Sequence, residues 1–196
     1  MNVFISGGCK NGKSMYAQTI AREMAKEQDK VSYYLATMRP TDEEDLKRID
    51  RHISEREGWG FTTLEQSENI LCCLKPVSEG QLLEKPCQSG AEEKANPAGV
   101  FLLDSVTALL SNEMFKADGS MDLDAGIRVA EELREFARRT GNTVFVSDYI
   151  YGEAAAYDPL TETYRKSLAL IDRTLAEACQ RVMEVSFGNV VEYKTF

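Results

Sequence analysis

The sequence predicts an α/β fold, with a mainly parallel β-sheet, helices on both of its faces and a β-hairpin near the C-terminal end. Apolar runs of strand length alternate with segments of helical periodicity almost throughout the chain, which is typical of a parallel sheet. Two of these runs, 100–104 and 142–148, have an apolar stretch and end in an aspartate, as expected of strands buried on both faces. Gly188-Asn189 separates two β-rich segments and predicts a two-residue hairpin turn.

The first strand, at 2–6, leads into a glycine-rich turn and then into helix-forming residues from Lys13 to Lys26. The turn has the spacing G-x-x-x-x-G-K-S of a phosphate-binding loop. Glycines let several backbone N–H groups surround an anion, and the following helix adds the positive end of its dipole. We expect Lys13 to contact the β- and γ-phosphates of a nucleotide and Ser14 to hold Mg²⁺. A chance glycine turn is the alternative. The predicted phosphate site consists of Gly7, Gly8, Cys9, Lys10, Asn11, Gly12, Lys13 and Ser14.

The remaining elements follow in order along the chain. Helix 42–57 begins after a capping box, Thr41-x-x-Glu44. In the helix at 122–139, an apolar stripe is expected to face the core and consists of Ile127, Ala130, Leu133, Phe136 and Ala137. We expect further strands at 30–37, 61–65, 100–104 and 142–148, further helices at 69–74, 105–115 and 161–180, and hairpin strands at 182–187 and 190–193.

Segment 75–99 interrupts this pattern, because it contains three prolines and has no apolar periodicity. We interpret it as a mobile surface insertion, either a lid or a disordered loop. The rest of the chain shows no internal repeat and has enough residues for one substantial core. We therefore expect a single domain over 1–196.

Polar residues close several of the predicted strands: Thr37, Asp104 and Asp148. Ligands of parallel sheets bind beyond the carboxyl ends of the strands, so these residues and the phosphate loop are expected to meet at one edge. Asp104 follows four apolar residues, as the metal-binding acid of a Walker B strand does, and is expected to hold Mg²⁺ through water. The alternative is that Asp104 caps the helix that follows.

The chain has one histidine, His52, which lies between Arg48 and Arg56 at i, i+4 spacing on the predicted helix. Neighbouring positive charge favours the neutral, nucleophilic form of an imidazole, and the two arginines can neutralise a phosphate. A solvated, charged helix face that includes His52 by chance is the alternative.

Composition excludes several classes of partner. The net charge of −9 argues against nucleic acid or an anionic membrane as the main partner. No apolar run approaches the roughly 20 residues that a membrane span requires. The five cysteines include no C-x-x-C pair, so we expect neither a disulfide framework nor a zinc site. Cys72 and Cys73 are expected to be small core residues, and the chain to reside in a reducing cytoplasm.

Several of these motifs resemble, in order, those of the bifunctional adenosylcobinamide kinase / adenosylcobinamide-phosphate guanylyltransferase family of cobalamin biosynthesis. The chain matches its Gly-Gly-x-x-x-Gly-Lys-Ser loop at 7–14, its Tyr-Ile-Ala-Thr strand end at 34–37 and its Arg-Ile-x-x-His-x-x-x-Arg motif at 48–56. A Trp/Thr/Glu segment follows at about 59–65. Then comes Leu102-Leu103-Asp104, with Thr107 and Asn112 in the next helix.

The resemblance implies a transferase with a P-loop fold related to RecA, assembled as a homotrimer, that uses ATP or GTP with Mg²⁺. It would phosphorylate a hydroxyl of the corrinoid adenosylcobinamide and then transfer GMP to that phosphate. His52 would attack the α-phosphate of GTP and carry the GMP. Besides residues 7–14, the resemblance places these residues at the nucleotide: Ala36, Thr37, Met38, Ile53, Ser54, Glu55, Arg56 and Asp104. Ser14 and Asp104 would hold the metal.

The second half of the chain departs from the family pattern. Asp148-Tyr149-Ile150-Tyr151 stands where the family has Asn-Glu-Val-Gly, and a later Phe-Arg-Asp run is matched only by Tyr164-Arg165-Lys166 and Asp172-Arg173. Because of these departures two other functions stay open. One is a P-loop kinase or nucleotidyltransferase for another small molecule, and the other is a non-catalytic nucleotide-binding module.

Overall fold

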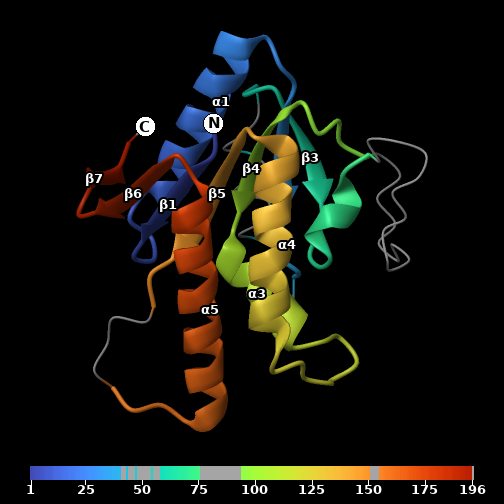
Figure 1. Ribbon diagram of the computed structural model, residues 1–196, viewed down its shortest axis with the longest axis vertical. Coiled ribbons are helices and arrows are strands. Elements are labelled where there is room, and N and C mark those ends of the chain that lie inside the picture. Colours follow the sequence, from blue (N-terminus) through green and yellow to red (C-terminus); the bar gives the residue numbers. More distant parts are fainter. Residues whose placement is uncertain are drawn as a thin grey trace.

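The computed structural model describes residues 1–40, 43, 47, 54, 58–75, 94–150 and 155–195. Within these residues the strands form one seven-stranded sheet in the order β3-β2-β4-β5-β1-β6-β7 (Figure 1). Neighbouring strands are parallel except β6 and β7, which form an antiparallel hairpin. The predicted α/β class, mainly parallel sheet and C-terminal hairpin are confirmed. The strands are β1 (Val3–Gly7), β2 (Ser32–Ala36), β3 (Phe61–Glu65), β4 (Val100–Asp104), β5 (Thr143–Asp148), β6 (Arg181–Ser186) and β7 (Asn189–Lys194).

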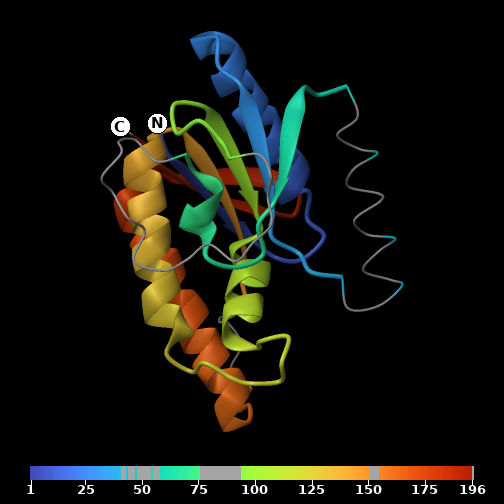
Figure 2. The ribbon, with the colours of Figure 1, turned by 90° about the vertical axis from the view of Figure 1, so that its right-hand side faces the viewer.

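Helices cover both faces of the sheet: α1 lies on one face, and α3, α4 and α5 lie on the other (Figures 1 and 2). Each face has its own apolar core. On the α4 side, the ring of Phe136 meets Phe101 and Phe145 edge to face, with ring centroids 5.3 Å and 6.4 Å apart. The helices are α1 (Lys13–Gln28), the short 3-10 helix η1 (Ile70–Cys73), α3 (Val106–Met114), α4 (Ala125–Thr140) and α5 (Pro159–Ala178).

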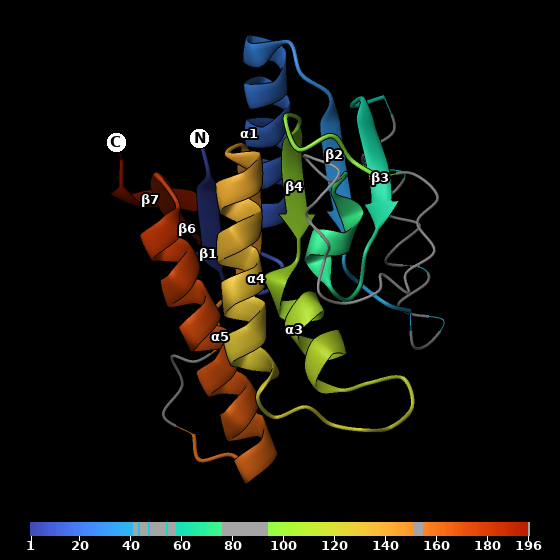
Figure 3. The ribbon, with the colours of Figure 1, turned by 45° about the vertical axis from the view of Figure 1, so that its right-hand side comes forward.

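The parallel strands end at the same edge of the sheet, and β4 leads from this edge directly into α3 (Figure 3). β5 pairs with β1 on one side and with β4 on the other. One strand therefore separates the strand that enters the phosphate loop from the strand that ends in Asp104.

The hairpin turn differs from the prediction. The two loop residues are Phe187 and Gly188, and Asn189 pairs with Ser186 as the first residue of β7. Phe187 and Gly188 both have positive φ, 51° and 75°. A two-residue turn that matches the twist of the strands requires positive φ at both positions, and the predicted Gly188-Asn189 pair is therefore wrong by one residue.

Two helices also depart in detail from their predictions. α5 begins at Pro159, because the carboxylate of Asp158 accepts hydrogen bonds from the N–H groups of Leu160 and Thr161. Ile127 was expected in the core, but its side chain is 58% exposed. It lies in the first turn of α4, whereas the apolar residues one turn later are buried.

Of the cysteines that the structure describes, Cys73 and Cys179 are buried free thiols, and burial raises the pKa of each to about 12. Cys9 is free and exposed. Cys72 is buried, as expected of a small core residue, but it is disulfide-bonded, which the sequence did not predict.

The predicted insertion at 75–99 lies mostly outside the described residues, which omit 76–93. Ala95 is fully buried: its N–H donates to the carbonyl of Cys73, and its carbonyl accepts from Lys75. In the described parts of the chain, we find no helix with both the length and the apolar character needed to cross a bilayer.

One buried charge joins three elements beside the sheet. The carboxylate of Glu113, which is fully buried, accepts hydrogen bonds from the Asn69 N–H (2.6 Å), Lys116 Nζ (2.8 Å) and Arg128 Nη1 (2.8 Å). Lys116 also binds Glu68, and Arg128 also binds a second carboxylate, at 2.8 Å. The Glu113 cluster therefore ties the start of η1 to α3 and α4.

Candidate nucleotide-binding site

The turn between β1 and α1 has the backbone that a phosphate loop needs. Gly12, at the N-cap of α1, has a φ of 89°, and Lys10 has a φ of 57°. A side chain at Gly7 would place its Cβ 2.4 Å from the carbonyl oxygen of Val185, so only glycine fits between β1 and β6 there. The side-chain amide of Asn11 donates to the same carbonyl and accepts from the Lys13 N–H at 3.3 Å. These contacts fix the turn before any ligand arrives.

Lys13 is the central charge of this turn. It is only 6% exposed, and its Nζ donates to the Gly8 carbonyl (3.0 Å) and to Asp148 Oδ1 (2.6 Å). The ammonium group is therefore held inside the loop by an acid from the neighbouring strand. A bound phosphate would have to share or replace that acid.

The strand end that carries Asp148 is fixed from the other face of the sheet. The Asp148 N–H donates to Thr107 Oγ1 (2.9 Å), and the hydroxyl of Tyr164 on α5 donates to the Thr107 carbonyl (2.9 Å). Burial raises the pKa of Tyr164, and the charges of Asp148 and Asp172 raise it further, so this hydroxyl stays protonated. α3 and α5 thus hold the end of β5 in place.

A second set of bonds holds the end of β2. Thr37 is fully buried, and its hydroxyl accepts from the N–H of Ser105 and donates to the Ser105 carbonyl, both at 2.8 Å. The amide of Asn112 donates to the Thr37 carbonyl at 2.7 Å. Thr37 was predicted to contact nucleotide, but its hydroxyl is already used both as a donor and as an acceptor, in its bonds to Ser105. The neighbouring Ala36 and Met38 are half-buried.

Asp104 ends β4 at this edge and is also half-buried. The alternative that Asp104 caps α3 is wrong, because the N-cap is Ser105, whose Oγ accepts from the Ala108 N–H at 3.2 Å. The carboxylate of Asp104 is therefore not used as a helix cap. A carboxylate and the Ser14 hydroxyl are both hard oxygen donors, of the kind that Mg²⁺ prefers.

Several predicted site residues lie outside the described residues: His52, Ile53, Glu55 and Arg56, together with Arg48. From the predicted helix at 42–57 the structure describes Glu43, Lys47 and Ser54, and each of them is helical and exposed. Of the loop, Gly8, Cys9 and Lys10 are exposed and Ser14 is half-buried.

The partnership between Asp148 and Lys13 is the main feature that the site prediction missed. The signal was present, since Asp148 ends an apolar strand in the same way as Asp104. Sequence alone does not show that β5, and not β4, is the strand next to β1.

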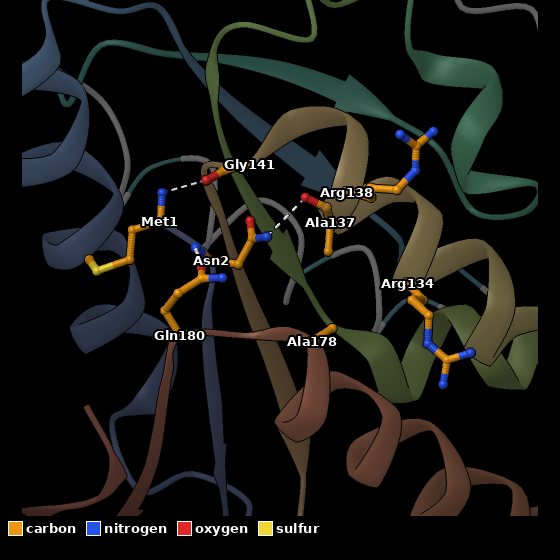
Figure 4. A pocket seen from close by; sticks show the side chains of 8 residues that line it. All are labelled: Met1, Asn2, Arg134, Ala137, Arg138, Gly141, Ala178 and Gln180. Carbon is orange, nitrogen blue, oxygen red and sulfur yellow. Dashed lines mark hydrogen bonds between the residues drawn. The ribbon is translucent and has the colours of Figure 1, made fainter. Parts of the chain in front are cut away.

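Two cavities lie away from the loop itself. One, of about 510 Å³, is at the opposite edge of the sheet, where Asn2, Gly141 and Gln180 flank the strand starts (Figure 4). The other, of about 350 Å³, lies between α5 and the β1-β6-β7 part of the sheet, and Ser6, Tyr149 and Asp172 are among its lining residues. Only the second adjoins the strand ends beside the phosphate loop.

Comparison with known proteins identifies the family. A family model described as cobinamide kinase / cobinamide phosphate guanyltransferase matches residues 3–193. No curated protein sequence gives a significant match.

Two of the solved structures that resemble this one are distant in sequence. A KaiC-like protein from the hyperthermophilic archaeon Pyrococcus horikoshii is 14% identical, with a TM-score of 0.49. The flagellar accessory protein FlaH from Methanocaldococcus jannaschii is 16% identical, with a TM-score of 0.48. Each comparison covers 99% of this chain and 78% of the other. The family match spans almost the whole chain and includes the phosphate loop and both strand-end acids, so the chain belongs to the cobinamide kinase / cobinamide phosphate guanyltransferase family.

Proposed function

We propose that this enzyme performs both reactions for which its family is named. It phosphorylates a hydroxyl of cobinamide and then transfers GMP from GTP to the new phosphate. The observation that carries the proposal is the buried ammonium of Lys13 inside a preformed phosphate loop, in a chain that matches the family from residue 3 to residue 193.

In the kinase step, the backbone N–H groups of residues 7–14 and the ammonium of Lys13 would bind the triphosphate and neutralise charge as it develops. Ser14 and Asp104 would hold Mg²⁺, which supplies further charge neutralisation at the phosphates. Ser14 is in the first turn of α1, directly after the phosphate loop, Asp104 is the last residue of β4, and both offer oxygen ligands. ATP and GTP are the proposed phosphate donors.

In the guanylyl step, His52 would be the nucleophile. An imidazole nitrogen attacks the α-phosphate of GTP, the new N–P bond forms, and the bond to pyrophosphate breaks. The phosphate of cobinamide phosphate then attacks the same phosphorus and releases the imidazole. Residues 53–56, with Ala36, Thr37 and Met38, are the proposed contacts to the nucleotide. For Thr37 that contact would come from its backbone, since its hydroxyl is bound to Ser105.

Labelling tests the covalent role of His52. The full-length protein is incubated with Mg²⁺ and GTP labelled at the α-phosphate, and His52→Ala is compared with Lys47→Ala, an exposed position in the same stretch. We expect one acid-labile GMP per chain in wild type and in Lys47→Ala, and none in His52→Ala. Acid-labile label that persists in His52→Ala would overturn the assignment.

We further propose a homotrimer located in the cytoplasm, where its nucleotide substrates are abundant. The trimer rests on the resemblance to the family, and an exposed apolar surface on the terminal hairpin supports self-association: Phe187 is 97% exposed, and Val190, Val191 and Tyr193 are also exposed. Light scattering of the purified protein measures the assembly. A mass of one or two chains would contradict the trimer.

A further inference from the structure

Asp148 lies beside the ammonium group that is proposed to bind the transferred phosphoryl group. Its Oδ1 is 2.6 Å from Lys13 Nζ, the atom that reaches the β- and γ-phosphates in a phosphate loop of this kind. A γ-phosphate that binds Lys13 therefore comes within a few ångströms of the Asp148 carboxylate. The side chain of Asp148 is 27% exposed, so a substrate can approach it.

The backbone of Asp148 cannot withdraw easily when the phosphate arrives. Asp148 pairs with Gly7 in the register of β5 and β1, and the N–H of Tyr149 donates to the Gly7 carbonyl at 2.9 Å. The Asp148 N–H is bound to Thr107, as described above. The acid is therefore attached to the start of the phosphate loop and to α3.

A fixed carboxylate beside a phosphate weakens nucleotide binding through like-charge repulsion. The repulsion is relieved when a hydroxyl group lies between the two anions and donates its hydrogen bond to the carboxylate. A hydroxyl held in this way has its oxygen directed at the phosphorus and its proton at a base. An aspartate has this relation to the substrate hydroxyl in the protein kinases.

A cavity adjoins the chain neighbour of this acid. The 350 Å³ cavity between α5 and the sheet is lined by Tyr149 and Ser6, the chain neighbours of Asp148 and Gly7. The Oγ of Ser6 is buried and has no hydrogen-bond partner within the described structure.

We propose that Asp148 is the general base of the phosphoryl-transfer step, acting on an aliphatic hydroxyl of the acceptor. The hydroxyl oxygen forms a bond to the γ-phosphorus while the bond from that phosphorus to the leaving nucleoside diphosphate breaks. The hydroxyl proton passes to the Asp148 carboxylate. This assignment rests on the proposed kinase function.

Asp148→Asn tests the assignment, because it keeps the shape of the side chain and removes its charge and basicity. Three quantities are measured on the full chain: nucleotide affinity, the rate of cobinamide phosphorylation at saturating substrates, and GMP labelling by GTP. We expect phosphorylation to slow by about 10²–10⁴-fold, the usual contribution of a general base. Nucleotide affinity should be unchanged or higher, and GMP labelling should stay within threefold.

The control is Asp158→Asn, which makes the same chemical change at the exposed cap of α5, where asparagine also serves. It should phosphorylate at the wild-type rate, and Asp148→Glu should recover part of the rate lost in Asp148→Asn. A phosphorylation rate within threefold of wild type in Asp148→Asn overturns the assignment, and so does a loss of nucleotide affinity that accounts for the slower rate. Wild-type protein that does not phosphorylate cobinamide refutes the proposed function itself, and the assignment with it.

Discussion

The carboxylate of Glu113 should be one of the largest single polar contributions to the stability of this protein. Glu113→Ala removes the acceptor of three hydrogen bonds, from the Asn69 N–H, Lys116 and Arg128. It leaves the half-buried Asn69 N–H without its acceptor, which costs at most about 1–3 kcal/mol. Removing one member of a buried ion pair costs about 3–5 kcal/mol.

The expected cost lies below the sum of these two values, which is about 4–8 kcal/mol. The side chains of Lys116 and Arg128 are 26% and 25% exposed, and each keeps another carboxylate partner, so neither charge is stranded. We therefore expect Glu113→Ala to lower the free energy of unfolding by about 3 kcal/mol. In a chain of this length each kcal/mol shifts the midpoint by about 2–4 °C, so Tm should fall by about 6–12 °C.

Glu113→Gln keeps the shape of the side chain and removes its charge. The pH dependence of stability in this variant therefore shows what the charge contributes. Burial by itself raises the pKa of Glu113, but the hydrogen bonds from Asn69, Lys116 and Arg128 outweigh it, and the pKa lies below its ordinary value. A lowered pKa stabilises the folded state above the ordinary pKa of glutamate, and this stability is lost as pH falls through the lowered value. The free energy of unfolding of wild type should therefore exceed that of Glu113→Gln most at neutral pH. The difference between the two proteins should become smaller as the pH is lowered.

Urea and thermal denaturation measure both effects, with Glu135→Gln as the control. Glu135 accepts from Arg138 and Arg139 on the surface of α4, and exposed pairs of this kind contribute about 1 kcal/mol or less. If Glu113→Ala loses no more stability than Glu135→Gln, the buried cluster does not stabilise the fold as we argue.

Three further substitutions test the loop and the packing of the helices. Gly7→Ala brings a methyl group 2.4 Å from the Val185 carbonyl, so we expect a loss of about 1–3 kcal/mol and weaker nucleotide binding, measured by denaturation and by titration with GTP. Lys13→Met should reduce triphosphate affinity at least tenfold; unchanged affinity would refute the assignment of the phosphate site. Gly126→Ala brings a Cβ 2.5 Å from the Cβ of Ser167 on α5 and should destabilise without changing nucleotide affinity. Adding Ser167→Gly should restore most of that stability, and no recovery would argue against a direct clash.

Local pattern was sufficient to predict most of the elements and the phosphate loop. The strands at 61–65 and 100–104 were predicted with their observed bounds. The first is rich in residues that favour strands, and the second is a short apolar run that ends in an acid. The loop was predicted from its spacing and its strand-to-helix context, because the glycines meet steric and backbone requirements: Gly7 has no room for a Cβ, and Gly12 has a positive φ.

The rest depends on which segments become neighbours in space. The bond from Lys13 to Asp148 joins residues 135 positions apart and exists only because β5 enters the sheet beside β1. In the same way, the Thr37 hydroxyl is occupied by Ser105 because β2 and β4 are adjacent. Ile127 fits a helical apolar stripe, yet periodicity does not say whether another element packs over it.

The amide of Asn11 has a consequence beyond the loop that contains it. It fastens the nucleotide turn to the carbonyl of Val185, near the far end of β6, 174 positions along the chain. The hairpin of β6 and β7 therefore supports the phosphate loop, although the two segments lie at opposite ends of the sequence. A chain break, a truncation or a lost contact in β6 or β7 would therefore weaken triphosphate binding, although every residue that binds the triphosphate would still be present.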